Sequence, residues 1–178
     1  MDVPPSWLVR PRVAFYDLDN IQLSALPPSD FDRGIEAIFD LDYLVIEGHA
    51  RDGLTNQPPR GLQLQLSTID GVPIDDTQVV LSLGYFQFKA KPGVFNFDIR
   101  EGRGRDIFSL ESVGNEGWDS PPVSITGNDI TVTSFEGLTL YPRVRRIPGM
   151  ERADVLDGFV IGEHQRKGVF DEWASRFV

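Results

Sequence analysis

Apolar and polar side chains alternate with a period of two over several short stretches of this 178-residue chain. Leucines alternate with glutamines over residues 62–66, and phenylalanines alternate with polar residues over 86–89 and again over 95–98. Successive side chains of a strand point to opposite faces of a sheet, so this pattern buries one face and exposes the other. The alternation therefore constrains the chain to β structure.

The same pattern predicts the other strands and one hairpin. Residues 35–42 alternate, and residues 43–46 are apolar on both faces, as expected for a central strand. The turn at Lys91-Pro92-Gly93 predicts that the strands on either side of it pair as a hairpin. Further strands are expected at residues 79–83, 107–113, 130–133 and 138–145.

Composition favours the same fold class. The chain has 18 Asp to 9 Glu and 14 Arg to 3 Lys, so the two charged residues that commonly fill exposed helix faces are scarce. It also has 17 Gly and 13 Pro, which punctuate short segments. We therefore predict an all-β fold, an antiparallel β-sandwich of about seven or eight strands.

The last quarter of the chain differs from the rest. Alternation stops after Pro148-Gly149, and Phe170, Trp173 and Phe177 are spaced as on one face of a helix. We predict that residues 1–150 form the sandwich domain and that residues 151–178 form a partly helical linker or docking tail. The three aromatic residues of that tail are candidate interface residues.

Charge and composition exclude several classes of partner. The formal net charge of -10 repels nucleic acid and anionic membranes. With no cysteine, the chain can form neither a disulfide nor a thiolate metal site. No apolar run is long enough to span a bilayer, so we expect no membrane span.

Candidate catalytic residues are few. His49 and His164 are too few for a histidine metal site, and no GxSxG motif accompanies them. The Asp-x-Asp pattern, which can hold a divalent cation against a diphosphate, occurs three times, whereas about two occurrences are expected by chance for this composition. The pairs are Asp17 and Asp19, Asp30 and Asp32, and Asp40 and Asp42. We favour surface carboxylates over a metal site for all three pairs, and Asp40 and Asp42 fit the solvent face of a strand.

Two other features admit two interpretations each. Arg143, Arg145 and Arg146 could bind an anion, but alternating arginines on a late strand more often protect a sheet edge, and we favour that interpretation. Trp118 lies in a loop-like stretch rich in Gly and Pro, where it could stack on a sugar or fill a partner's pocket. Folding back over the end of the sandwich is the favoured alternative for this residue.

Several stretches, taken together and in order, resemble one family. They are Asp2 to Trp7, Tyr16 to Ile21, Glu47 to His49, Gln57 to Gln63, Leu83 to Ala90, Pro92-Gly93 and Ser120 to Pro122. The family is that of the UDP-glucose:glycoprotein glucosyltransferases. The resemblance covers most of residues 2–155, and the tail from Gly168 to Phe177 is similar to the segment shortly before the family's catalytic domain.

This resemblance implies a β-sandwich taken from a multidomain enzyme of the endoplasmic reticulum lumen. The family has thioredoxin-like domains, two β-sandwiches and a C-terminal catalytic domain, and this chain resembles the sandwich immediately before that last domain. The parent would transfer glucose from UDP-glucose, with a divalent cation (Ca or Mn), to high-mannose N-glycans of misfolded glycoproteins. The family's catalytic Asp-x-Asp lies in the catalytic domain, so the resemblance implies no catalytic, cofactor-binding or metal-binding residue here and an inactive fragment.

The resemblance also implies a role and partners. The sandwich is expected to act as a spacer and platform for the parent's catalytic domain, beside the thioredoxin-like domains and, through the parent, misfolded glycoprotein clients. The alternative is a carbohydrate-binding or protein-binding β-sandwich module. That alternative is supported by the stretches Ile46 to Gly48, Pro58-Pro59, Gly84 to Phe86 and Pro92-Gly93, which also resemble prealbumin-like and carboxypeptidase-regulatory-like sandwiches.

Overall fold

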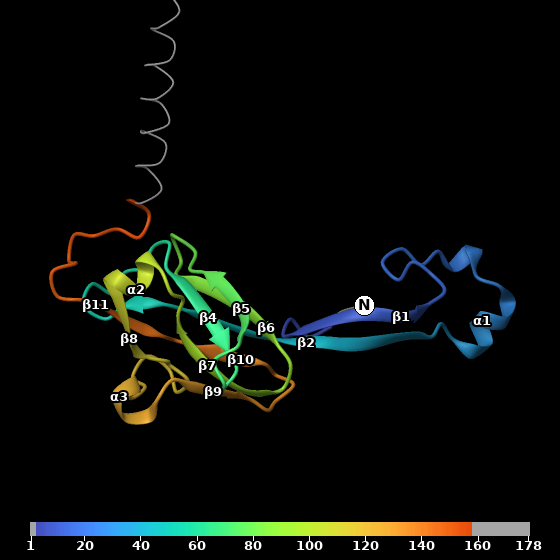
Figure 1. Cartoon of the computed structure of the whole chain (residues 1–178). Coiled ribbons are helices and arrows are strands. Elements are labelled where there is room, and N and C mark those ends of the chain that lie inside the picture. Colours follow the sequence, from blue (N-terminus) through green and yellow to red (C-terminus); the bar gives the residue numbers. More distant parts are fainter. Residues whose placement is uncertain (1–2, 158–178) are drawn as a thin grey trace, which may run out of the picture.

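Two packed β layers and a projecting two-stranded arm make up the computed structural model, which describes residues 3–157 (Figure 1). The first layer is fully antiparallel. Its strands, in spatial order, are β5 (Pro73–Gln78), β4 (Gln63–Ser67), β7 (Gly93–Ile99) and β9 (Asp129–Val132). The predicted helical tail lies outside the described residues.

The second layer consists of two short sheets that continue into each other. In the first sheet, β2 (Ala37–His49) pairs with β6 (Tyr85–Ala90) and β10 (Leu138–Leu140). In the second sheet, β11 (Arg143–Arg146) pairs with β3 (Arg51–Asp52) and β8 (Phe108–Ser112). One residue separates β2 from β3 and two separate β10 from β11, so the same chain segments run through both sheets.

The predicted β-sandwich is confirmed, with one addition to its topology. The pairings of β10 with β2 and of β11 with β3 are parallel, whereas the other pairings are antiparallel. The C-terminal strands therefore insert beside the central strand in the same direction as that strand. Short helices complete the body: α2 (Arg103–Ile107) links β7 to β8, and α3 (Val123–Thr126) precedes β9.

The predicted hairpin is wrong, although both of its strands exist. β6 pairs with β2 and β7 pairs with β4 and β9, so the turn at Lys91-Pro92 carries the chain from one layer to the other. The phenylalanines of the two strands face each other across the core instead of lying side by side. Phe97 has its ring centre 5.9 Å from that of Phe86 and 6.1 Å from that of Phe88.

The core lies between the layers and follows the predicted alternation. Leu62, Leu64 and Leu66 are all fully buried, as are Phe86 and Phe97 at the centre. The side chains between them on the same strands are exposed or half-buried. The prediction of which face is buried is therefore confirmed for the strands on which the fold depends.

Strand prediction failed at the edges of the sheets. Residues 79–83 do not form the predicted strand, because residues 81–83 form a turn, and the strand β5 precedes them. β5 lacks alternation of apolar and polar residues because none of its side chains is buried. The Asp75 carboxylate accepts a hydrogen bond from the Lys89 backbone N–H at 3.1 Å, which joins this edge to the second layer.

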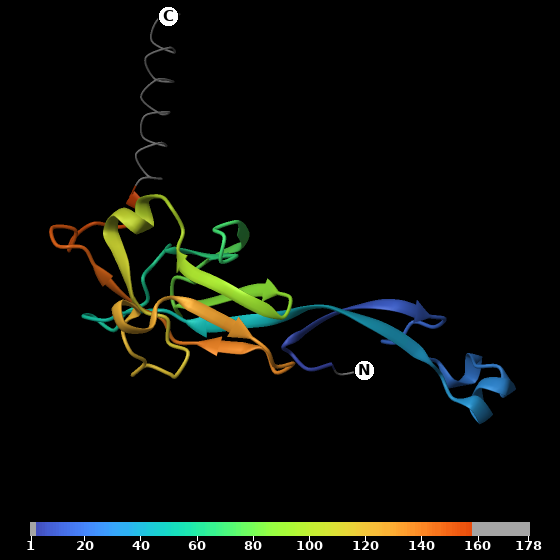
Figure 2. The same cartoon turned by 60° about the horizontal axis from the view of Figure 1, so that its bottom comes forward.

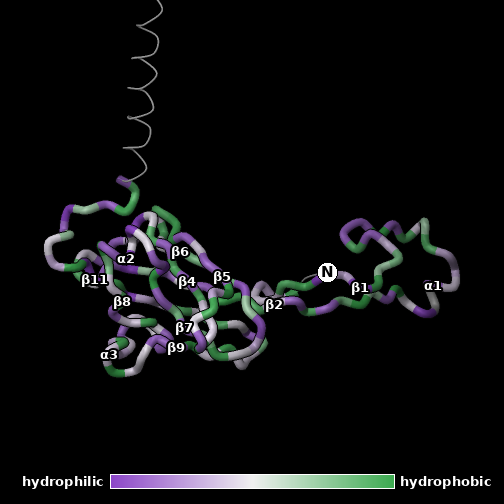
Figure 3. The backbone as a smooth tube through the Cα atoms, in the orientation of Figure 1, coloured by the Kyte–Doolittle hydropathy of each residue, from purple (hydrophilic) through white to green (hydrophobic). Residues whose placement is uncertain are grey.

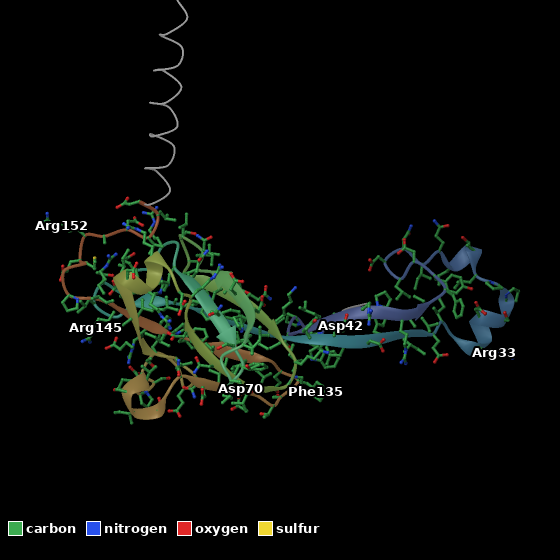
Figure 4. All side chains as sticks on the ribbon, in the orientation of Figure 1. Arg33, Asp42, Asp70, Phe135, Arg145 and Arg152 are labelled. Atoms are coloured by element: carbon green, nitrogen blue, oxygen red, sulfur yellow. The ribbon has the colours of Figure 1, made fainter. Side chains whose placement is uncertain are left out.

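The arm is formed by β1 (Trp7–Ala14) and the N-terminal half of β2, and it extends well beyond the sandwich as a twisted ribbon (Figures 1 and 2). Its far end carries a loop with η1 (Leu23–Ala25) and α1 (Pro28–Arg33). Purple and green alternate along the arm, which shows mixed hydropathy rather than a wholly polar surface (Figure 3). Figure 4 places Arg33 near the arm's far end and Asp42 at its junction with the sandwich.

Candidate interaction surfaces

The described residues bring together no group of side chains that we identify as catalytic. Within residues 3–157 no three His, Asp or Glu side chains lie close enough to hold a metal ion. His49 Nδ1 lies 3.3 Å from the Leu83 carbonyl oxygen, and its ring packs edge-on against Tyr85. Over this same range, no helix combines the length and apolar character needed to cross a membrane. His164 lies outside the described residues.

Tyr85, which packs against His49, has a raised pKa. Burial and the hydrogen bond that its hydroxyl donates to Glu47 at 2.9 Å raise the pKa of Tyr85 above its ordinary value. Both causes favour the neutral phenol. This group thus fixes two neighbouring strands, β2 and β6, and has no catalytic arrangement around it.

The aspartate pairs lie on the arm. Asp17 and Asp19 form a turn near its far end, in which the Asp19 backbone N–H donates to the Asp17 carboxylate. Asp30 belongs to α1, and its carboxylate accepts a short hydrogen bond from the Tyr16 hydroxyl, which raises the pKa of Tyr16. Of Asp32, only the backbone is described, in α1.

Asp40 and Asp42 occupy the polar face of the arm, as their alternation predicted. Asp40 pairs with Arg12 and Asp42 pairs with Arg10, each with 3.4 Å between nitrogen and oxygen. Exposed ion pairs of this kind contribute little stability, so they orient the two strands more than they hold them together. The opposite face of the ribbon is apolar.

That apolar face is partly open to solvent. Val9 lies opposite Leu41, and Pro11 lies opposite Phe39 in the register of β1 and β2. Leu41 is 37% exposed, and Val9 and Phe39 are only half-buried. A two-stranded ribbon is marginally stable alone, so an amphipathic one with an open apolar face is suited to packing against another surface.

The three arginines of β11 bind other parts of the fold. The prediction that they protect a sheet edge is wrong. β11 is paired on both sides, by β3 and β8, so it is not an edge. Arg145 pairs with Glu111 at 2.7 Å. Arg143 donates to the backbone carbonyls of Trp118 and Ser120 at 2.6 and 3.1 Å.

Arg146 attaches the segment that leaves the sandwich. Its guanidinium stacks on the Phe108 ring, lies 3.4 Å from the buried Asp52 carboxylate and donates to the carbonyls of Met150 and Ala153 at 3.1 and 2.6 Å. Planar guanidinium groups suit such combined stacking and multiple donation. Arg146 therefore fixes both the body and the start of the C-terminal segment.

Residues 147–157 form a segment, here named the strap, that runs across the sandwich surface. Arg103 Nε donates to the Asp154 carbonyl at 2.9 Å, and Val155 is only 8% exposed. Leu156 packs on Gly61 so closely that a Cβ on this glycine would lie 2.6 Å from Leu156 Cδ2. The strap thus stays attached to the sandwich beyond residue 151, where the linker was predicted to begin.

The strap also has internal order. Hydrogen bonds from the backbone N–H groups of Gly149 and Glu151 lower the pKa of the Glu151 carboxyl. The Leu156 N–H donates to the Asp154 carboxylate at 2.9 Å. These hydrogen bonds from backbone N–H groups to the carboxylates of Glu151 and Asp154 hold successive turns of the strap.

Trp118 is the predicted interface residue that the structure describes. It is 38% exposed, and its ring centre lies 5.1 Å from that of the half-buried Tyr141. It therefore packs partly on the body while part of the residue remains exposed. Phe170, Trp173 and Phe177 lie outside the described residues.

The arm was not predicted as a functional surface from the sequence, and residues 151–157 of the strap were predicted only as the start of a linker or docking tail. The arm's alternation over residues 7–13 is visible in the sequence, but Pro11 lowers the expectation of a strand. The strap has no periodic pattern, because its contacts are single apolar side chains and backbone carbonyls. Only tertiary structure shows either surface.

Comparison with known proteins gives one consistent result. Residues 47–157 match the family model described as UDP-glucose:Glycoprotein Glucosyltransferase. The chain is 38% identical over 157 residues to the UDP-glucose:glycoprotein glucosyltransferase of Drosophila melanogaster and 39% identical over 158 residues to glucosyltransferase 1 of Mus musculus, covering 88% of this chain and 10% of each relative. It is 39% identical over 159 residues to the probable glucosyltransferase A of Dictyostelium discoideum, covering 88% of this chain and 9% of that protein. The chain thus spans about a tenth of the length of the curated relatives it matches.

Proposed function

The chain belongs to the UDP-glucose:glycoprotein glucosyltransferase family, and on that premise we propose that it is a non-catalytic β-sandwich segment that orients the parent's catalytic domain. On this proposal the parent acts in the endoplasmic reticulum lumen. There it transfers glucose from UDP-glucose to N-glycans of misfolded glycoproteins. UDP-glucose and its divalent cation bind in the catalytic domain, outside this chain.

The observation that carries this proposal is the attachment of the strap. A spacer orients the next domain only if the chain leaves the spacer from a fixed point. The strap is attached by hydrogen bonds from two guanidinium groups, those of Arg103 and Arg146. It is also attached by the apolar side chains of Val155 and Leu156, up to the end of the described residues. Such attachment limits the positions open to the next domain, which lowers the entropy cost of a productive arrangement.

The arm supports an anchoring role at the other end of the segment. The arm projects away from the sandwich (Figure 1), and its partly open apolar face includes Val9, Phe39 and Leu41. The chain spans about a tenth of its relatives, so most of a parent protein is available to cover that face. We propose that the arm packs against another part of the parent, so that arm and strap fix the sandwich between two neighbours.

A strap variant of the parent enzyme tests the orienting role. Replacing Arg103 by methionine and Leu156 by alanine removes one attachment of each kind and leaves Arg146 and the buried Asp52 paired. We expect glucose transfer to a misfolded glycoprotein to fall about tenfold, corresponding to about 1.4 kcal/mol of transition-state stabilisation. The affinity for UDP-glucose, measured by calorimetry on the same variant, should stay unchanged.

The matched control is Arg152→Met in the same strap. Arg152 is exposed, and no hydrogen bond or ion pair of its side chain occurs among residues 3–157. This variant should transfer glucose at the wild-type rate. If the double variant also kept the wild-type rate while hydrogen exchange showed a loosened strap, the orienting role would be refuted.

A separate measurement tests the non-catalytic role. Titrating the 178-residue chain with UDP-glucose in the presence of Mn²⁺ or Ca²⁺ should give no binding heat, because the described residues bring no three potential ligands together. The parent enzyme, titrated under the same conditions, is the positive control. Saturable heat with the isolated chain would contradict the proposal.

A further inference from the structure

Trp118 lies in a loop that hydrogen bonds hold in place. The Glu116 N–H donates to the Ser120 hydroxyl oxygen at 2.9 Å, and that hydroxyl donates to the Gly117 carbonyl at 2.7 Å. Ser120 is buried, and its carbonyl accepts from Ser112 and Arg143. A loop this well bonded does not need an exposed indole for its own stability.

Tyr141, in the link between β10 and β11, and Arg143, at the start of β11, hold the same loop by further contacts. The Tyr141 N–H donates to the Gly114 carbonyl at 3.0 Å, and a Cβ on Gly114 would lie 2.1 Å from the Tyr141 backbone. Gly114 also has φ of +77°, which favours glycine. Arg143 Nη1 reaches the Trp118 carbonyl itself at 2.6 Å. The backbone that carries the indole is therefore held in place before any ligand arrives, which lowers the entropy cost of binding.

The loop that carries the indole is rich in polar acceptors. Asn115, Glu116 and Asp119 belong to the same loop and are exposed, and none of their side chains has a hydrogen-bond partner among the described residues. Arg143, which contacts this loop, already donates hydrogen bonds to the backbone carbonyls of Trp118 and Ser120. The loop thus combines a partly exposed indole with amide and carboxylate oxygens and a negative local charge.

From this combination we propose that Trp118, with Tyr141 beside it, is a binding site for a neutral hexopyranose unit of a glycan. The C–H face of a pyranose ring packs on the electron-rich face of an indole, and its hydroxyls donate to nearby carboxylate and amide oxygens. The carboxylates of Glu116 and Asp119 disfavour sialylated or phosphorylated sugars through like-charge repulsion. An apolar protein partner fits less well, because the core of a protein interface is depleted of charged residues.

This proposal rests on the proposed function in one respect: a parent that acts on glycoproteins brings glycans to this surface. The site is distinct from the strap and lies on a different loop. It would hold part of a substrate glycan, weakly, while the catalytic domain acts elsewhere on the same molecule. Such a second contact raises the effective concentration of the substrate without any new chemistry.

The test is a titration of the 178-residue chain with mannotriose, followed by the NMR signal of the Trp118 indole N–H. The expected result is a saturable shift with a Kd on the order of 1 mM, which is typical of a single weak site. Mannitol, which carries similar hydroxyls but no ring face, should produce no shift. Trp118→Phe should bind within about threefold of wild type, because it keeps an aromatic face, and Trp118→Leu, followed through loop amide signals, should weaken binding at least about tenfold.

Three outcomes would overturn the site. They are the absence of a saturable shift, an equal response to mannitol, and unchanged binding by Trp118→Leu. If no sugar bound but the indole became shielded in the whole parent, Trp118 would be a contact between domains. None of these results affects the strap experiment, in which Trp118 is intact, so failure of the sugar site and failure of the orienting role are distinguishable.

Discussion

Gly48→Ala is expected to destabilise the chain by more than about 3 kcal/mol, because a methyl group at this position has no space. A Cβ on Gly48 would lie 2.0 Å from the Leu140 carbonyl oxygen and 2.8 Å from Phe86 Cζ. The first of these atoms is backbone, on the parallel strand β10, and cannot move without breaking the pairing of β10 with β2. Urea denaturation followed by circular dichroism would measure the loss.

Gly93→Ala is the matched control for this substitution. Gly93 also belongs to a strand, and its Cβ would lie 3.3 Å from the nearest atom, Phe95 Cζ, which is part of a side chain. The free energy of unfolding of Gly93→Ala should stay within about 1 kcal/mol of the wild-type value, because alanine also lowers the conformational entropy of the unfolded chain. Equal denaturation midpoints for Gly48→Ala and wild type would show that β10 does not pass beside Gly48.

Phe97→Ala is expected to cost about 3–5 kcal/mol, the usual range for removing a fully buried aromatic ring. Phe97 is 0% exposed and meets Phe86 and Phe88 from the opposite layer, with ring centres 5.9 and 6.1 Å away. The substitution would leave a cavity at the centre of the sandwich. A fall in the urea midpoint with an unchanged m-value would identify a loss of stability without loss of compactness.

Phe15→Ala serves as its control, since Phe15 is 84% exposed near the far end of the arm. We expect a change of less than about 0.5 kcal/mol. A comparable loss for both variants would mean that the arm, and not the space between the layers, carries the stability of the chain.

Burial could be predicted from the sequence because it is encoded locally. Each fully buried leucine of residues 62–66 is separated from the next by a glutamine, and this spacing suffices to assign the core face. The family resemblance, carried by short stretches in order, was also readable without a structure, and the family match confirms it.

Strand pairing could not be predicted in the same way. A short turn after Ala90 is compatible with a hairpin and with a crossing between layers, and both place Phe88 and Phe97 in the core. The choice depends on strands that are distant in sequence, namely β2, β4 and β9. Alternation gives the face of a side chain and carries no information about its neighbouring strand.

The roles of the arginines and of the strap were hidden for a related reason. Alternating arginines on residues 143–146 look alike whether the strand is an edge or is paired on both sides. Their partners include the backbone carbonyls of Trp118, Ser120, Met150 and Ala153, to which residue type gives no clue. The contacts of these arginines and of the strap therefore became visible only from the tertiary structure.

The late position of the parallel strands has a consequence for synthesis. About 90 residues separate the end of β2 from the start of β10, so a ribosome needs about 5–20 s to reach the strand that completes the second layer. Until then the backbone edge of β2 that pairs with β10, at residues 46–48, stays unpaired. An unpaired strand edge can pair with other chains, so this edge of β2 is a point of exposure while the segment emerges, and a chain terminated before β10 keeps it.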